Sequence, residues 1–115
     1  AALERVPEVI FHFTQVGAFH QEVNRVCGNG LAWMLMERGE LEAARAVIER
    51  AARSADGAQH DWILDTQTRI LMAMGLREEA WAIADRVLRR NPDFEDFQDI
   101  RKDPEFARWR EAPDR

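Results

Sequence analysis

The chain repeats itself with a period of 36 residues, and this repeat constrains the fold more than any other feature. Residues 35–54 (LMERGELEAARAVIERAARS) share residue types at matched positions with residues 71–90 (LMAMGLREEAWAIADRVLRR). Gly39 matches Gly75, and in both stretches a Glu follows three residues later and an Ala five residues later. A fixed period in this range is typical of stacked supersecondary units.

The apolar residues recur at steps of three and four, which indicates helices, and no sustained strand-like alternation is present. Gly39 and Gly75 each follow an apolar helical stretch, a position that suits a helix C-terminus. Pro92 forces the residue before it out of the helical region and so ends a helix there. We therefore predict an all-α fold with helices near 3–16, 19–38, 40–54, 60–74, 76–90, 93–101 and 104–111.

Two local features bear on these helices. Residues 17–30 contain Gly17, Gly28 and Gly30, and a glycine in a helix interior costs about 1 kcal/mol relative to alanine. The second helix therefore either breaks in this stretch, or its glycines let another helix pack closely. Asp103 and Pro104 predict the start of the last helix, with Asp as the cap and Pro in the first turn.

The repeat resembles the tetratricopeptide repeat, a unit of two antiparallel helices. The resemblance covers residues 25–92 and is stronger in the second unit. There Gly75 is the turn Gly, Ala80 the packing Ala and Pro92 the closing Pro. Leu64 and Leu71 stand at large apolar positions, and Thr68 stands where a small residue is usual. The first unit matches at Leu31, Ala32, Leu35, Gly39 and Ala44. It departs at Gly28, where a large residue is usual, and at Asp56, which replaces the closing Pro.

The resemblance implies a right-handed α-α superhelix of about five to seven helices in a single domain, residues 1–115. Residues 25–59 and 60–92 would be the two repeats, and residues 1–24 an N-terminal helix or a degenerate repeat. Residues 93–115 would form capping helices. Phe94, Phe97 and Ile100 lie at helical steps there and would cover the last repeat, because an uncapped end exposes core surface to water.

In this family the first helix of each pair lines a concave groove that holds a peptide or partner helix. The resemblance places eight residues at groove positions: Val26, Asn29, Trp33 and Met36, then Trp62, Asp65, Arg69 and Met72. Trp and Arg are frequent interface anchors, and Met adapts to irregular partners. Two alternatives stay open. Trp33 and Trp62 could belong to the core, and Asp65 and Arg69, four residues apart, could simply pair with each other.

Composition and the lack of long apolar runs argue against several other classes of partner. The net charge of −5 argues against nucleic acid, which needs clustered positive charge. No apolar run approaches the roughly 18 residues of a membrane-spanning helix, and no signal peptide is visible. Cys27 is the single cysteine, so no internal disulfide can form. We expect a cytoplasmic protein that binds neither nucleic acid nor membrane.

No pattern of catalytic or metal-binding residues is visible either. His12, His20 and His60 lack the spacing of zinc sites. Cys27 has no neighbouring base and is expected to be a small buried hydrophobe. The sequence predicts no catalytic residue, no metal and no cofactor, and hence no enzyme. A small helical hydrolase or metal protein is the least favoured alternative.

The sequence therefore predicts a non-catalytic protein–protein interaction module, of scaffold, chaperone or partner-antagonist type, that binds a peptide or partner helix in its groove. The alternative is a structural or oligomerisation segment of a larger protein whose activity lies elsewhere. Self-association of the chain is compatible with either function.

Overall fold

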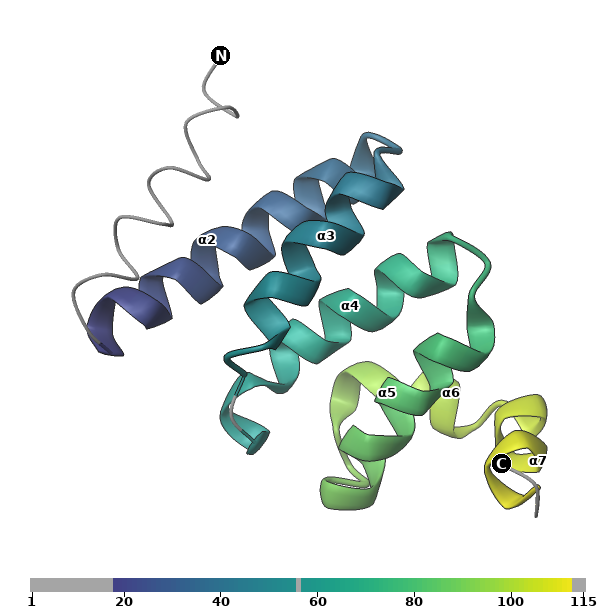
Figure 1. Ribbon diagram of the computed structural model, residues 1–115. Helices are drawn as coiled ribbons and strands as arrows, with labels where there is room; N and C mark the ends of the chain where they lie inside the picture. The colour runs from purple at the N-terminus through teal and green to yellow at the C-terminus, as the bar shows by residue number, and fades with distance from the viewer. Residues whose placement is uncertain (1–17, 56, 113–115) are drawn as a thin grey trace. The chain divides into compact units, whose positions relative to one another are not determined.

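The computed structural model describes residues 18–55 and 57–112, and these residues contain helices and no strand (Figure 1). The predicted all-α fold is confirmed. The α-helices are α2 (Ala18–Glu37), α3 (Leu41–Ala52), α4 (Asp61–Ala73), α5 (Arg77–Arg90), α6 (Gln98–Arg101) and α7 (Pro104–Glu111), and the 3₁₀ helices are η1 (Gly57–His60) and η2 (Glu95–Phe97).

The chain divides into two compact units, Ala1–Ala55 and Asp56–Arg115. The first contains the hairpin of α2 and α3, and the second contains the hairpin of α4 and α5 followed by η2, α6 and α7. The repeats predicted from the sequence meet at residues 59–60, close to this division. The predicted helix at 3–16 lies outside the described residues.

The two hairpins turn in the same way, as the matched glycines predicted. Gly39 and Gly75 have φ angles of 81° and 80°, a region that other L-residues seldom adopt. The residue after each glycine donates its backbone N–H to a carbonyl five residues earlier, at 2.9 Å in both hairpins (Glu40 to Leu35 and Leu76 to Leu71). This bond identifies a Schellman motif, which satisfies the free carbonyls at the helix end.

Helix α2 continues through Gly28 and Gly30 without a break. A Cβ atom added at Gly28 would lie 3.5 Å from Cβ of Ala51 in α3, whereas one added at Gly30 would meet no neighbour within 4 Å. Of the two possibilities that the glycines raised, close packing is therefore correct for Gly28. The glycine brings the backbone of α2 close to α3 in the first unit.

In the second unit, α4 and α5 bury apolar residues that recur at helical steps. Ile63, Ile70, Ala80, Ala84 and Val87 have no exposed surface. Thr68 is also fully buried, and its hydroxyl donates to the carbonyl of Leu64 at 2.8 Å. This bond explains how a polar side chain is accommodated in the core.

The C-terminal segment covers the second hairpin. Of the three residues predicted to cover the last repeat, Phe97 and Ile100 are buried and Phe94 is half-buried. The prediction of one helix near 93–101 is wrong, because this segment forms η2 followed by α6. Helix α7 begins as expected: Pro104 is its first residue, and the Asp103 carboxylate accepts the backbone N–H of Glu105 at 2.9 Å. The sequence did not predict the aromatic cluster of Trp81, Phe106 and Trp109, whose ring centroids lie 5.7 to 5.9 Å apart. This cluster joins α7 to α5.

The described helices are all too short or too polar to cross a lipid bilayer.

Candidate functional site

The four predicted groove residues of the first unit lie on successive turns of α2. Val26 and Trp33, seven residues apart, are 56% and 42% exposed. Asn29 and Met36 are half-buried. An exposed tryptophan is not a core residue, so the alternative that Trp33 fills the core is wrong. The helix presents Val26 and Trp33 to solvent on the same face.

Two residues that the sequence reasoning missed extend this exposed face. Met34 is 39% exposed, and Cys27 is also exposed. The expectation that Cys27 is a buried hydrophobe is wrong, because the register that buries Leu31 and Leu35 turns Cys27 away from α3. The seven-residue spacing from Cys27 to Met34 repeats that from Val26 to Trp33 and could have indicated the position of both. We call the surface formed by Val26, Cys27, Trp33 and Met34 the outer face of α2.

The predicted groove residues of the second unit are less accessible. Trp62, Asp65, Arg69 and Met72 are all half-buried on α4. The indole N–H of Trp62 donates to the carbonyl of Gln59 at 3.0 Å, and its ring contacts His60 edge-on with centroids 6.1 Å apart. Trp62 therefore supports the start of α4, and only part of its ring surface is available to a partner.

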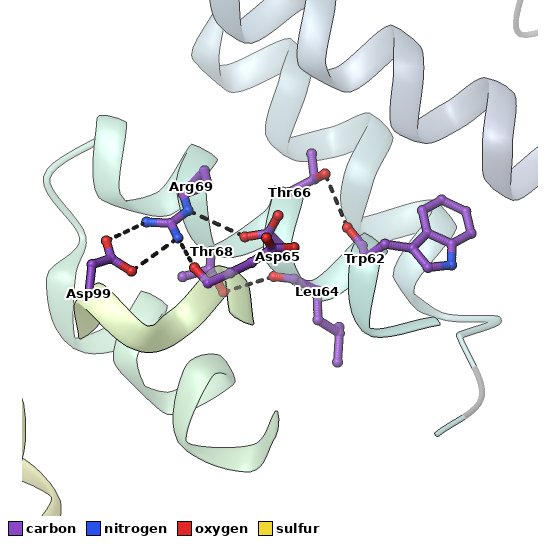
Figure 2. Close-up of polar contacts among 8 residues, drawn as sticks. Trp62, Leu64, Asp65, Thr66, Thr68, Arg69 and Asp99 are labelled. Carbon is purple, nitrogen blue, oxygen red and sulfur yellow. Dashed lines mark hydrogen bonds and ion pairs between the residues drawn. The ribbon is translucent and has the colours of Figure 1, made fainter. Parts of the chain in front are cut away.

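Arg69 is bound by the chain's own acidic groups (Figure 2). Its guanidinium lies 3.3 Å from Asp65, one helical turn earlier, so the pair that the spacing allowed does form. It also contacts the Asp99 carboxylate at 3.1 Å and donates to the Asp96 carbonyl. The guanidinium carbon lies 5.8 Å from the centroid of the Phe97 ring. Arg69 thus fastens η2 and α6 to α4.

Burial and charge act on these acids in opposite directions. Burial raises the pKa of Asp65, and the nearby negative charge of Asp96 raises it further, although Arg69 opposes both effects. The hydrogen bond from Arg69 lowers the pKa of Asp99. Arg69 therefore stabilises the charged form of both carboxylates. Its effect on the pKa exceeds the effect of burial only at Asp99, which is the more exposed of the two.

No cluster of three or more His, Cys, Asp or Glu side chains suited to a metal ion occurs in residues 18–55 and 57–112. His60 is buried against Trp62, and the side chains of His12 and His20 lie outside the described part of the chain. The features that the described residues do offer are the outer face of α2 and the ionic contacts that hold the C-terminal segment on α4.

The eight predicted positions fall into two groups of different character. Val26 and Trp33 are open to solvent in the first unit, whereas Arg69 is already bound by the chain's own C-terminal segment in the second. No family model matches the chain, and no curated protein or solved structure matches it either. The resemblance to tetratricopeptide repeats therefore stays a prediction from the sequence.

Proposed function

We propose that the chain is a non-catalytic protein-interaction module and that a partner helix docks on the outer face of α2. The observation that carries this proposal is a difference between the two units. Trp33 and Arg69 are separated by the repeat period of 36 residues and occupy matched positions on the first helix of each hairpin. In the second unit, η2 and α6 cover Arg69. In the first unit, Trp33 is 42% exposed.

The chemistry of the outer face suits a protein partner. Exposed apolar side chains gathered on one surface are typical of interaction sites, and tryptophan is among the residues that most often dominate binding energy. Glu37 lies one turn after Trp33 and is exposed. A partner helix with an apolar anchor for Trp33 and a Lys or Arg for Glu37 would complement this surface in shape and charge.

The test is a selection of helical peptides from a random displayed library on the full chain, followed by affinity measurements on the selected peptides. We expect apolar and basic residues to be enriched. Trp33→Ala should weaken binding by at least about tenfold, as expected for an interface anchor. Glu42→Ala, an exposed residue on α3, is the matched control and should leave binding unchanged.

Peptides that bind equally well to Trp33→Ala would contradict the proposal, provided that the circular dichroism spectrum shows the variant folded. Sedimentation of the chain alone tests the alternative of an oligomerisation segment. A dimer that dissociates on Trp33→Ala would show that the outer face joins two copies of this chain, and the docking of a foreign helix would then be rejected.

A further inference from the structure

The first unit contains a groove between α2 and α3 that the sequence did not predict. Its volume is about 330 Å³, and Leu31, Val47 and Ala51 supply apolar walls. Gly28 and Ala51 also line it, and both are buried. A Cβ atom added at Gly28 would lie 3.5 Å from that of Ala51, so the close contact of the two helices forms part of the floor of the groove.

The groove runs along the hairpin and is open to solvent. It is lined from Gln21 to Leu31 on α2 and from Ala46 to Ser54 on α3. The stretch of α2 is about 15 Å long, since each residue of a helix adds about 1.5 Å. Gln21, Ala46 and Ser54 are exposed and form the rim. An open, elongated groove with an apolar floor suits a helix of a partner, which lays its apolar face into it.

The charge at the groove is positive. Of the described residues that line it, the charged ones are both arginines. Arg25 contacts Glu22 at 2.8 Å, so its charge is balanced. Arg50 is exposed and makes no ion pair within the described residues, and the same holds for Arg53, one turn later on α3. The whole chain has a net charge of −5, so this positive region is a local exception that favours an acidic partner.

The matched surface of the second hairpin has different chemistry. Asp61 lies one repeat period after Arg25, and Gln67 lies one period after Leu31. The second hairpin thus has an acid where the first has an arginine, and an amide where the first has a large apolar side chain. An acidic helix with an apolar face should therefore distinguish the first hairpin from the second.

We propose that this groove binds an acidic amphipathic helix of a protein partner. Large apolar side chains on one face of that helix pack on Leu31, Val47 and Ala51, and an Asp or Glu beside them pairs with Arg50. The groove shares no residue with the outer face of α2, where the exposed Glu37 favours a basic partner. The inference is therefore independent of the proposed function.

The first arm of the test measures the binding of three synthetic helical peptides to the full chain by calorimetry. The first peptide has leucines at i, i+4 and i+7 with glutamates on both sides of this stripe. The second has lysines in place of the glutamates, and the third has glutamines in place of the leucines. All three are also measured on Trp33→Ala, which removes the anchor of the outer face.

On Trp33→Ala we expect the glutamate peptide to bind as tightly as it does to the unaltered chain. The other two peptides should bind this variant at least about tenfold more weakly, because one meets like charge and the other buries no apolar surface. A lysine peptide that binds Trp33→Ala as tightly as the glutamate peptide does would overturn the proposal. So would a glutamate peptide without saturable binding up to millimolar concentration.

The second arm locates the site by charge reversal. Arg50→Glu should weaken the glutamate peptide about tenfold and strengthen the lysine peptide, because the sign of the contact is exchanged. Arg86→Glu is the matched control, since Arg86 lies one repeat period later and is also exposed. Amide NMR signals of Gly28 and Ala51 should shift when the glutamate peptide binds.

Equal losses in the two variants, or shifts confined to the second unit, would reject this groove as the site. Sedimentation of the chain alone tests a different occupant. Self-association that the glutamate peptide disrupts and Arg50→Glu abolishes would overturn the proposal and assign the groove to a second copy of this chain.

Discussion

Both hairpins have a long-range side-chain contact at matched positions. The arginine lies at the first of the two positions in one hairpin and at the second in the other. In the first hairpin, Arg25 in the N-terminal half of α2 donates to Ser54, 29 residues later. In the second, Arg90 at the end of α5 donates to Asp61 at the start of α4, also 29 residues apart. The contact positions are separated by the repeat period, so 25 matches 61 and 54 matches 90. The repeat preserves the place of the contact and not the residue types.

The hairpins also differ in what covers them. The second has its own C-terminal segment, which reaches α4 through Arg69 and α5 through the aromatic cluster of Trp81, Phe106 and Trp109. In the first hairpin, α2 exposes Val26 and Trp33. This difference indicates that a matched position in a repeat can serve the fold in one copy and remain exposed to solvent in the other.

Loss of the aromatic cluster is the largest change that the comparison predicts. Phe106 is fully buried, so Phe106→Ala should lower the free energy of unfolding by about 3–5 kcal/mol, the usual cost of a phenylalanine deleted from a core. Urea denaturation followed by circular dichroism measures it. Phe106→Leu keeps most of the volume and should cost clearly less. A loss under about 1 kcal/mol would mean that α7 contributes little to the second unit.

We expect the removal of the arginine from this contact to lower the stability of the two hairpins by different amounts. Arg90→Ala leaves the Asp61 carboxylate, whose side chain is 4% exposed, buried without its partner, and should cost about 1–3 kcal/mol. Arg25→Ala frees groups of the exposed Ser54 and the carboxylate of the exposed Glu22, and it should cost about 1 kcal/mol or less. Chemical denaturation of both variants tests the order. If Arg25→Ala lowered the stability more than Arg90→Ala, the loss of stability would not depend on how deeply the acceptor group is buried.

Replacing the glycine should destabilise the two turns by the same amount. Gly39→Ala and Gly75→Ala each force an alanine into the left-handed region, at about 1–2 kcal/mol. The φ angles agree within a degree, and neither site offers a neighbour within 4 Å, so the cost should come from the backbone alone. Thermal unfolding of the two variants gives the comparison. Costs that differ by more than about 1 kcal/mol would imply that the surroundings, and not the turn, set the penalty.

The smallest effect concerns the ion pair between Arg69 and Asp99 in the second unit. Arg69 lowers the pKa of Asp99 in the folded protein, so the contact stabilises the fold above the unfolded-state pKa, and this stability is lost as the pH falls through the folded-state pKa. Asp99→Asn should therefore cost a few tenths of a kcal/mol to about 1 kcal/mol at neutral pH, and nothing in acid. Denaturation at several pH values measures this change.

Asp93→Asn serves as the control for that experiment. Asp93 has a 96% exposed side chain and contacts Arg101 only at 3.9 Å, so the substitution should leave the pH profile nearly unchanged. A stability difference for Asp99→Asn that persists at low pH would show that the contact acts through something other than the charge of Asp99.

The sequence predicted well the features that depend on neighbours in the chain. The all-α class, both glycine turns, the end of α5 before Pro92 and the Asp103 cap of α7 are set by backbone preferences and by bonds across a few residues. Apolar spacing likewise predicted the buried faces of α4 and α5. These are local signals, which explains why a single sequence suffices for them.

Only the tertiary structure decided what each side chain meets. Residue spacing allowed the pair of Arg69 with Asp65, but the contact of Arg69 with Asp99, 30 residues away, depends on how the C-terminal segment folds back. The exposure of Cys27 likewise depends on where α3 packs. The physical reason is that burial and long-range bonds are properties of the packed elements, whereas the sequence specifies directly only the elements themselves.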